Sequence, residues 1–197
     1  MFAHWRVILA LAAIGGGIAV LVDDGAIERP PGVLAPTEPK QKLLNRPAFA
    51  FGEYQLTPLA DFDIQARVLS VEKYSVDGGS RLSPIDFALG WGPMSDSAVL
   101  GHFRVTQGAR FFTIYPDEQA IDLQTALLNA ANMHLIPATS LLRDAMKQVR
   151  PGNVVHLRGK LISAQGPNGF TWSSSLTRTD TGAGACELFY VESLEPR

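Results

Sequence analysis

The sequence predicts a mainly β domain with inserted helices, preceded by one membrane-spanning helix at the N-terminus. Three observations indicate this fold class. Glycine and proline are frequent, with 18 and 13 of the 197 residues, which favours short strands and turns over long helices. Most segments between residues 62 and 193 alternate apolar and polar side chains, as half-buried strands do. Residues 7–22 form an apolar run without any charge.

The apolar run is predicted to be a membrane helix, because in lipid only a helix satisfies its own backbone hydrogen bonds. Counted from Phe2, it reaches the roughly 20 residues that span a bilayer. Charges flank it on both sides, which disfavours a buried soluble helix. No A-x-A site ends it cleanly, which disfavours a cleaved signal peptide. We therefore predict an uncleaved signal-anchor at residues 1–24, held in the lipid bilayer through residues 7–22.

The charge distribution predicts the orientation of this anchor. Arg6 precedes the apolar run, whereas Asp23 and Asp24 follow it. The positive-inside rule then places the N-terminus in the cytoplasm. The predicted localisation is a single-pass protein of the bacterial inner (plasma) membrane, with its domain on the periplasmic side.

Residues 25–49 are rich in proline and polar side chains and show no apolar periodicity. Such sequence is semi-rigid and extended, so we predict a linker that holds the domain away from the membrane. The alternative is a strap that packs over the domain. Four apolar side chains would then dock: Val33, Leu34, Leu43 and Leu44.

The predicted domain spans residues 50–197, and its first half reads as three strands. Residues 62–74 alternate, with Phe62 and Ile64 on one face and Asp63 on the other. The turn sequence SVDGGS follows. Two further strands, 98–106 and 110–115, are predicted to form a hairpin around Gln107 and Gly108.

The second half is predicted to open with helices and to close with strands. A helix is expected over residues 119–130, and a second one begins at Thr139 or Ser140 as N-cap and ends before Pro151. Residues 153–163 alternate as a strand. Two more segments complete the sheet: 169–175 and 186–193.

This order of three strands, a helical insertion and two or three strands resembles the OB-fold, a barrel whose helix lies between strands three and four. The piece VRPGNVVHLRGKLIS is similar to the start of such a fourth strand, and ACELFYVESLE to a closing strand. The resemblance covers residues 62–193 and implies an OB-like barrel of five to six strands. OB-folds bind oligonucleotides, oligosaccharides and proteins on the face of strands two and three, although the fold alone does not set the function.

Three short segments also resemble, as a set, uncharacterised membrane-anchored bacterial proteins with an OB-fold-like domain. They are GWGPMSD, NMHLIP and SSLTRTDTGAGACE. This resemblance implies no particular activity.

The GWGPMSD loop is the first candidate site. Trp91, between glycines and next to a proline, would present an aromatic platform to a ligand. The alternative is a turn whose Trp91 plugs the end of the barrel.

The NMHLIP segment is the second candidate, and we expect it to lie between the two helices. His134 would act as a general base or contact a ligand, oriented by Asn132 or Asp180. The structural alternative is that Asn132 ends a helix and His134 hydrogen-bonds a buried carbonyl group.

The third candidate is the polar stretch between residues 173 and 192. Its serines include Ser175, its charged pair is Arg178 and Asp180, and Cys186 is the only cysteine of the chain. Arg178 would hold a carboxylate or phosphate, or pair with Asp180 across a turn. Cys186 would be a nucleophile only if His134 lies beside it, and an inert core residue otherwise.

These features together favour a binding function. We predict a membrane-anchored periplasmic module that recruits a protein or envelope-glycan partner through Trp91, Asn132, His134, Arg178 and Asp180. The alternative is a hydrolase that uses Cys186 or Ser175 with His134, and enzyme activity is the less favoured class. A nucleic-acid-binding OB module is disfavoured because the net charge is −2. The four histidines are widely spaced, so we expect no metal and no cofactor.

Overall fold

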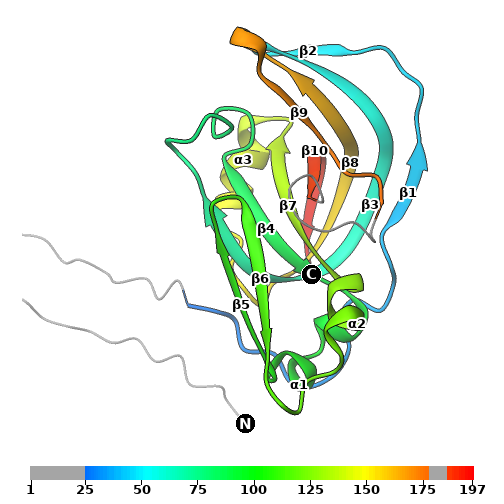
Figure 1. The fold of residues 1–197 in the computed structure, drawn as a ribbon, viewed down its shortest axis with the longest axis vertical. Coiled ribbons are helices and arrows are strands. Elements are labelled where there is room, and N and C mark those ends of the chain that lie inside the picture. Colours follow the sequence, from blue (N-terminus) through cyan, green and yellow to red (C-terminus); the bar gives the residue numbers. More distant parts are fainter. Residues whose placement is uncertain (1–24, 178–185) are drawn as a thin grey trace, which may run out of the picture.

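The computed structural model describes residues 25–177 and 186–197. The predicted signal-anchor at 1–24 and the stretch 178–185 lie outside the described residues. In the part of the chain that is described, no helix combines the length and the apolar character needed to cross a membrane. The domain is mainly β with a few short helices, as the sequence predicts (Figure 1).

Five strands close into a ring in the order β3, β4, β7, β10, β8 and back to β3. Their pairs are antiparallel except for the parallel pair of β7 and β10. Strand β3 closes the ring because it is long enough to pair with β8 along its first part and with β4 along its last part. The ring strands are β3 (Tyr54–Lys73), β4 (Ile85–Gly90), β7 (Ala130–Pro137), β8 (Val154–Gln165) and β10 (Glu187–Pro196).

Shorter elements surround the ring. Strands β1 (Lys40–Leu43) and β2 (Phe49–Phe51) pair with β3, and β9 (Thr171–Ser173) pairs with β8. Strands β5 (Phe103–Gly108) and β6 (Phe111–Pro116) form a separate two-stranded sheet, a hairpin that stands beside β4 in Figure 1. The helices are α1 (Ser97–Leu100), α2 (Leu123–Leu128) and α3 (Ser140–Lys147), with 3₁₀ turns η1 (Gly92–Ser95) and η2 (Pro167–Gly169).

Alternate residues of the ring strands belong to two apolar clusters, which separates the inside of the ring from its outer face. The inner cluster takes side chains from all five strands, and the rings of Phe62 and Phe189 meet edge to face at 5.2 Å within it. The outer cluster includes Ile136, Leu188 and Trp172. Strands β4 and β7 are therefore buried on both faces.

Three sequence predictions about helices and strands differ from the structure. NMHLIP lies between α2 and α3 in the chain, as predicted, but it is a strand: it forms most of β7, in the middle of the ring. Burial on both faces removes the alternation that marks a half-buried strand, so this segment does not look like one. The predicted helix over 119–130 is reduced to α2, and the first residues of the predicted strand 98–106 belong to α1.

The second ring strand, β4, is absent from the sequence prediction for the same reason, because its sequence IDFALG is buried at every position. The predicted hairpin exists, but it lies outside the ring. Its turn is Ala109–Arg110 rather than Gln107–Gly108, since Gly108 and Phe111 form the last strand pair.

The proline-rich segment is a strap rather than a linker that stands off the domain. The Ile27 N–H donates to the Pro151 carbonyl at 2.7 Å, and the Ala35 N–H donates to the Ser95 hydroxyl at 3.0 Å. Ala35 is fully buried, whereas Val33 and Leu43 are exposed. The strap is thus attached through backbone groups and strand β1, while of its four apolar candidates only Leu34 and Leu44 are half-buried.

Candidate functional site

Three polar side chains are buried on the outer face of β4 and β7. Asp86 on β4 lies opposite His134 on β7, and Asn132 precedes His134 by two positions on the same face. Their exposed fractions are 0% for Asp86, 2% for Asn132 and 3% for His134. Buried polar groups need hydrogen-bond partners, and three neighbouring segments supply them here.

The first partner is Arg110, at the tip of the β5–β6 hairpin. Its guanidinium donates from Nε and Nη2 to the two carboxylate oxygens of Asp77, at 3.0 and 2.8 Å. Its Nη1 donates to Asp86 Oδ1 at 2.8 Å. Such charge-assisted, two-pronged hydrogen bonds are among the strongest in proteins. Arg110 therefore joins the turn after β3 to the start of β4.

Two aromatic rings complete the surroundings of this guanidinium. The Arg110 Cζ atom lies 3.6 Å from the centre of the Tyr74 ring and 5.5 Å from that of Trp172. The Tyr74 hydroxyl also accepts a hydrogen bond from the Arg110 backbone N–H at 3.0 Å. A cation over an aromatic face gains electrostatic attraction from the ring. We call Tyr74, Asp77, Asp86 and Trp172 the Arg110 cage.

Asp86 links the cage to His134. The Nδ1 atom of His134 is 2.8 Å from Asp86 Oδ2, and the imidazole lies against Trp172 with ring centres 4.7 Å apart. One carboxylate thus contacts both a guanidinium and an imidazole away from solvent. A buried carboxylate is costly unless it is paired and hydrogen-bonded in this way.

Further hydrogen bonds connect Asn132 on β7 to the β5–β6 hairpin. The Asn132 amide donates from Nδ2 to the Arg110 carbonyl at 3.0 Å and accepts at Oδ1 from Gln107 Nε2 at 2.6 Å. The Cys186 Sγ atom lies 3.9 Å from the same Arg110 carbonyl oxygen and 4.0 Å from Asn132 Nδ2. Side chains from β5, β7 and the start of β10 therefore fix the hairpin tip.

The turn that carries Arg110 is strained. Both of its residues are non-glycine and have positive φ, 49° for Ala109 and 70° for Arg110. Two-residue hairpin turns with positive φ at both positions strongly favour Asn-Gly, because other side chains are strained there. Strain of this kind persists when surrounding contacts hold it, and it is concentrated at functional sites.

Replacing Ala109 by glycine should stabilise the protein. The left-handed conformation costs an alanine about 1–2 kcal/mol, more than the extra backbone entropy that glycine loses, so we expect a gain of about 0.5–1 kcal/mol in unfolding free energy. Chemical denaturation of the full chain measures it. Ala145→Gly, on the exposed side of helix α3, is the matched control and should lose about 1 kcal/mol. A lower unfolding free energy in Ala109→Gly would show that the backbone of Ala109 is not strained.

The hydrogen bonds from Arg110 lower the pKa of Asp77 below its usual range. A carboxyl group whose folded pKa is depressed contributes stability above its unfolded pKa, near 3.9, and loses it as the pH falls through the folded value. We therefore expect the wild type to lose more stability than Asp77→Asn between about pH 5 and pH 2. Denaturation curves over this range test it, and parallel pH profiles for the two proteins would contradict it.

The structure brings together three of the residues singled out in the sequence, Asn132, His134 and Cys186. Trp91 lies elsewhere, with 1% of its surface exposed in the inner apolar cluster of the ring, so it offers no platform to a ligand. The Ser175 hydroxyl donates to the Thr177 carbonyl and accepts from the Thr177 N–H, both at 3.1 Å. The remaining two candidates, Arg178 and Asp180, lie outside the described residues.

The residues that matter most at this site are absent from the sequence analysis as site residues: Arg110, Asp86, Asp77, Tyr74 and Trp172. One signal existed, because Asp86 interrupts the apolar run of IDFALG. An acid in a buried segment requires a partner. The identity of that partner depends on a hairpin tip that folds over another strand, and no local pattern reports such a contact.

The arrangement is suited to holding a cation more than to nucleophilic attack. The His134 ring is hydrogen-bonded to Asp86, not to Cys186 or Ser175, and Trp172 lies against it. A nucleophile and its base should be within hydrogen-bond reach of each other. The cage, in contrast, surrounds a guanidinium with carboxylates and aromatic rings.

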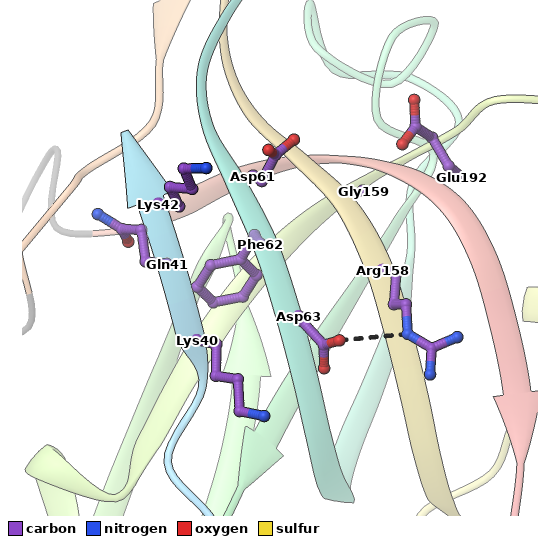
Figure 2. Close-up of a pocket in the computed structure, with 9 residues that line it drawn as sticks. All are labelled: Lys40, Gln41, Lys42, Asp61, Phe62, Asp63, Arg158, Gly159 and Glu192. Atoms are coloured by element: carbon purple, nitrogen blue, oxygen red, sulfur yellow. Dashed lines mark hydrogen bonds and ion pairs between the residues drawn. The ribbon is translucent and has the colours of Figure 1, made fainter. Parts of the chain in front are cut away.

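A shallow groove of about 330 Å³ lies elsewhere, over β1, β3 and β8 (Figure 2). Its charges are mostly paired: Asp63 contacts His156 at 2.7 Å and Arg158 at 3.2 Å. Burial raises the pKa of Asp63, but hydrogen bonds from His156 and Arg158 outweigh burial and lower it. Lys160 pairs with Glu192 at 2.7 Å. This groove is an ion-pair network without an excess of one charge.

A nucleic-acid site would need a patch of unpaired basic residues, but the four candidates Arg104, Arg110, Arg158 and Lys160 have partners of their own. Arg110 and Arg158 pair with carboxylates, as does Lys160. Arg104 lies over the Tyr115 ring, 4.1 Å from its centre. In residues 25–177 and 186–197, no group of three or more His, Cys, Asp or Glu side chains is arranged to hold a metal ion.

No protein-family model matches the chain, and no curated protein and no solved structure matches it significantly.

Proposed function

We propose that this chain is a membrane-anchored binding module on the periplasmic side of the bacterial inner membrane, and that its partner binds over the outer face of β4 and β7. The domain would be an OB-like barrel. The ring order supports this assignment, with β7 parallel to β10 and helix α3 between β7 and β8. In OB-folds, ligands bind on the face of strands two and three, between the loops that follow strands one and four. The corresponding strands here are β4 and β7.

The observation that carries the proposal is the convergence of three connections over these two strands. The loop after β3 contributes Tyr74 and Asp77, the β5–β6 hairpin contributes Arg110, and β9 contributes Trp172. Loops that place aromatic and charged side chains on a rigid sheet are typical of binding surfaces.

The rim of this region also exposes apolar side chains. Val76 lies next to Asp77 in the loop after β3 and is 96% exposed, and Phe111 follows Arg110 and is 48% exposed. Because Asp77 and Arg110 are paired, these two apolar residues belong to neighbouring segments. Exposed apolar residues beside polar groups are typical of contact sites for a partner. A protein or an envelope glycan would fit this chemistry.

Site-specific cross-linking tests the proposal. A photo-reactive amino acid placed at Val76 or at Phe111 in cells should yield a discrete adduct, with a protein or with cell-wall glycan. The matched control is the same amino acid at Leu141, which is 81% exposed on α3. Equal labelling at all three positions, or no adduct at the rim, would count against a binding face here. Protease treatment of spheroplasts tests the location, since a periplasmic domain should be degraded.

A second candidate, a cysteine-dependent hydrolase, is favoured by one observation. The hydrogen bond from His134 to Asp86 is of the kind that orients a catalytic base, and Cys186 borders the same network through Asn132. Titrating Cys186 with a thiol reagent separates the two functions. Rapid labelling of the native protein with an apparent pKa well below about 8.5 would favour the hydrolase. Labelling only after unfolding would leave the binding module.

A further inference from the structure

We propose that the Arg110 cage is an arginine-binding site, occupied within the chain by Arg110, and that an arginine side chain of a protein partner takes its place. This inference rests on the proposed function, because it names the chemistry of the group that the face of β4 and β7 would recognise. Arg110 would then act as an internal competitor that a partner has to displace.

The cage matches a guanidinium in shape as well as in charge. Asp77 accepts two parallel hydrogen bonds, at 3.0 and 2.8 Å, while Asp86 accepts a third at 2.8 Å from another nitrogen. The Tyr74 ring lies 3.6 Å from the Cζ atom. A planar fork of donors that stacks on an aromatic face is a property of arginine and not of lysine, whose ammonium is compact and strongly hydrated. The site therefore selects the guanidinium group.

The present occupant is held in a way that allows exchange. The hairpin that carries Arg110 forms its own two-stranded sheet and, among the residues that the structure describes, has no strand pairing with the ring. Its turn is strained at Ala109 and Arg110. The Arg110 side chain is 16% exposed, so the cage opens toward the surface. Displacing Arg110 relieves the strain of the turn, which partly offsets the lost hydrogen bonds.

An empty cage would require a cation of the same kind. Once Arg110 leaves, two carboxylates face the site, and that of Asp86 is fully buried. Asp86 would keep only His134 as a partner. A buried carboxylate that loses its guanidinium is destabilised, so exchange is favourable only when an incoming group restores the same hydrogen bonds. Val76 and Phe111 at the rim would contact apolar residues next to the partner's arginine. An arginine flanked by apolar residues in an exposed segment of a protein meets both requirements.

The test begins with an emptied cage in the full chain, purified in mild detergent. Arg110→Ala should bind N-ethylguanidinium about tenfold or more tightly than ethylammonium, measured by the rise in melting temperature and by calorimetry. The double variant Arg110→Ala/Asp77→Asn is the matched control and should lose this preference. If Arg110→Ala does not fold alone, folding that is recovered by N-ethylguanidinium and not by ethylammonium gives the same answer.

The wild type tests the exchange itself. A short peptide with one arginine between apolar residues should shift the NMR resonance of the Trp172 indole N–H, and the same peptide with lysine should not. The wild type should bind the arginine peptide at least about a hundredfold more weakly than Arg110→Ala, because Arg110 competes for the site. Arg81→Ala removes an exposed ion pair outside the cage and serves as a folded reference.

The outcomes separate this inference from the proposed function. No preference for guanidinium in Arg110→Ala would overturn the inference. The inference would also be overturned if N-ethylguanidinium binds Arg110→Ala but the wild type never responds to the arginine peptide. The cage would then only hold the hairpin in place. In both cases adducts at Val76 or Phe111 would still support a binding face. A response to the arginine peptide without any adduct at the rim in cells would support the cage and count against the proposed function.

Discussion

Replacing Arg110 by alanine is expected to lower the unfolding free energy by about 3–5 kcal/mol, the usual loss when one partner of a buried ion pair is removed. Asp86 has no exposed surface and would lose its guanidinium partner, while Asp77 would lose two hydrogen bonds. The interactions with Tyr74 and with Trp172 would be lost as well. Chemical denaturation of the full chain, followed by Trp fluorescence, measures the change.

The matched control for this prediction is Arg81→Ala. Arg81 also pairs with a carboxylate, Glu53 at 3.3 Å, but the two side chains are 80% and 44% exposed. Exposed ion pairs contribute about 0–1 kcal/mol, so this variant should unfold almost as the wild type does. A decrease of less than about 1 kcal/mol in the unfolding free energy of Arg110→Ala would mean that water or His134 compensates Asp86. The ion pairs of Arg110 would then be weaker than their geometry indicates.

Replacing Gly152 by alanine is expected to cost about 2–4 kcal/mol and to loosen the strap. Gly152 has φ of +89°, and a Cβ atom there would collide with the carbonyl oxygen of Ile27. The substitution therefore adds backbone strain and displaces the strap where the Arg29 Nε donates to the Gly152 carbonyl at 3.0 Å. Limited proteolysis within residues 25–48 and chemical denaturation should both show the change.

Gly169→Ala separates the two causes. Gly169 also has positive φ, +74°, but nothing lies within 4 Å of a Cβ atom there. It should lose only the conformational penalty of about 1–2 kcal/mol and leave the strap protected from protease. Equal losses in the two variants, with no extra cleavage of the strap in Gly152→Ala, would show that the contact with Ile27 contributes little.

In the β5–β6 hairpin, the local sequence predicts the strands, whereas tertiary contacts decide the position of the turn. Strand-type residues over 98–106 and 110–115 were enough to predict two strands and a hairpin, which the structure has at 103–116. Its turn was misplaced onto Gln107–Gly108, because glycine is the usual residue for positive φ. In the structure Ala109 and Arg110 take that conformation instead. The contacts of Arg110 with Asp77 and Asp86 hold a turn that the local sequence disfavours.

Residue patterns along the chain were sufficient to predict the mainly β class, strand β8 and the part of β3 from residue 62, because alternating apolar and polar side chains mark a strand. Its prolines also set an extended segment at residues 25–48, although not where that segment lies. The tertiary structure alone decided that β4 and β7 are ring strands, since burial on both faces removes the period. It alone decided the site as well, because Tyr74, Asp86, Arg110 and Trp172 come from four separate segments. Such long-range contacts depend on how strands pair and how hairpins fold over them, and local residue patterns do not predict either.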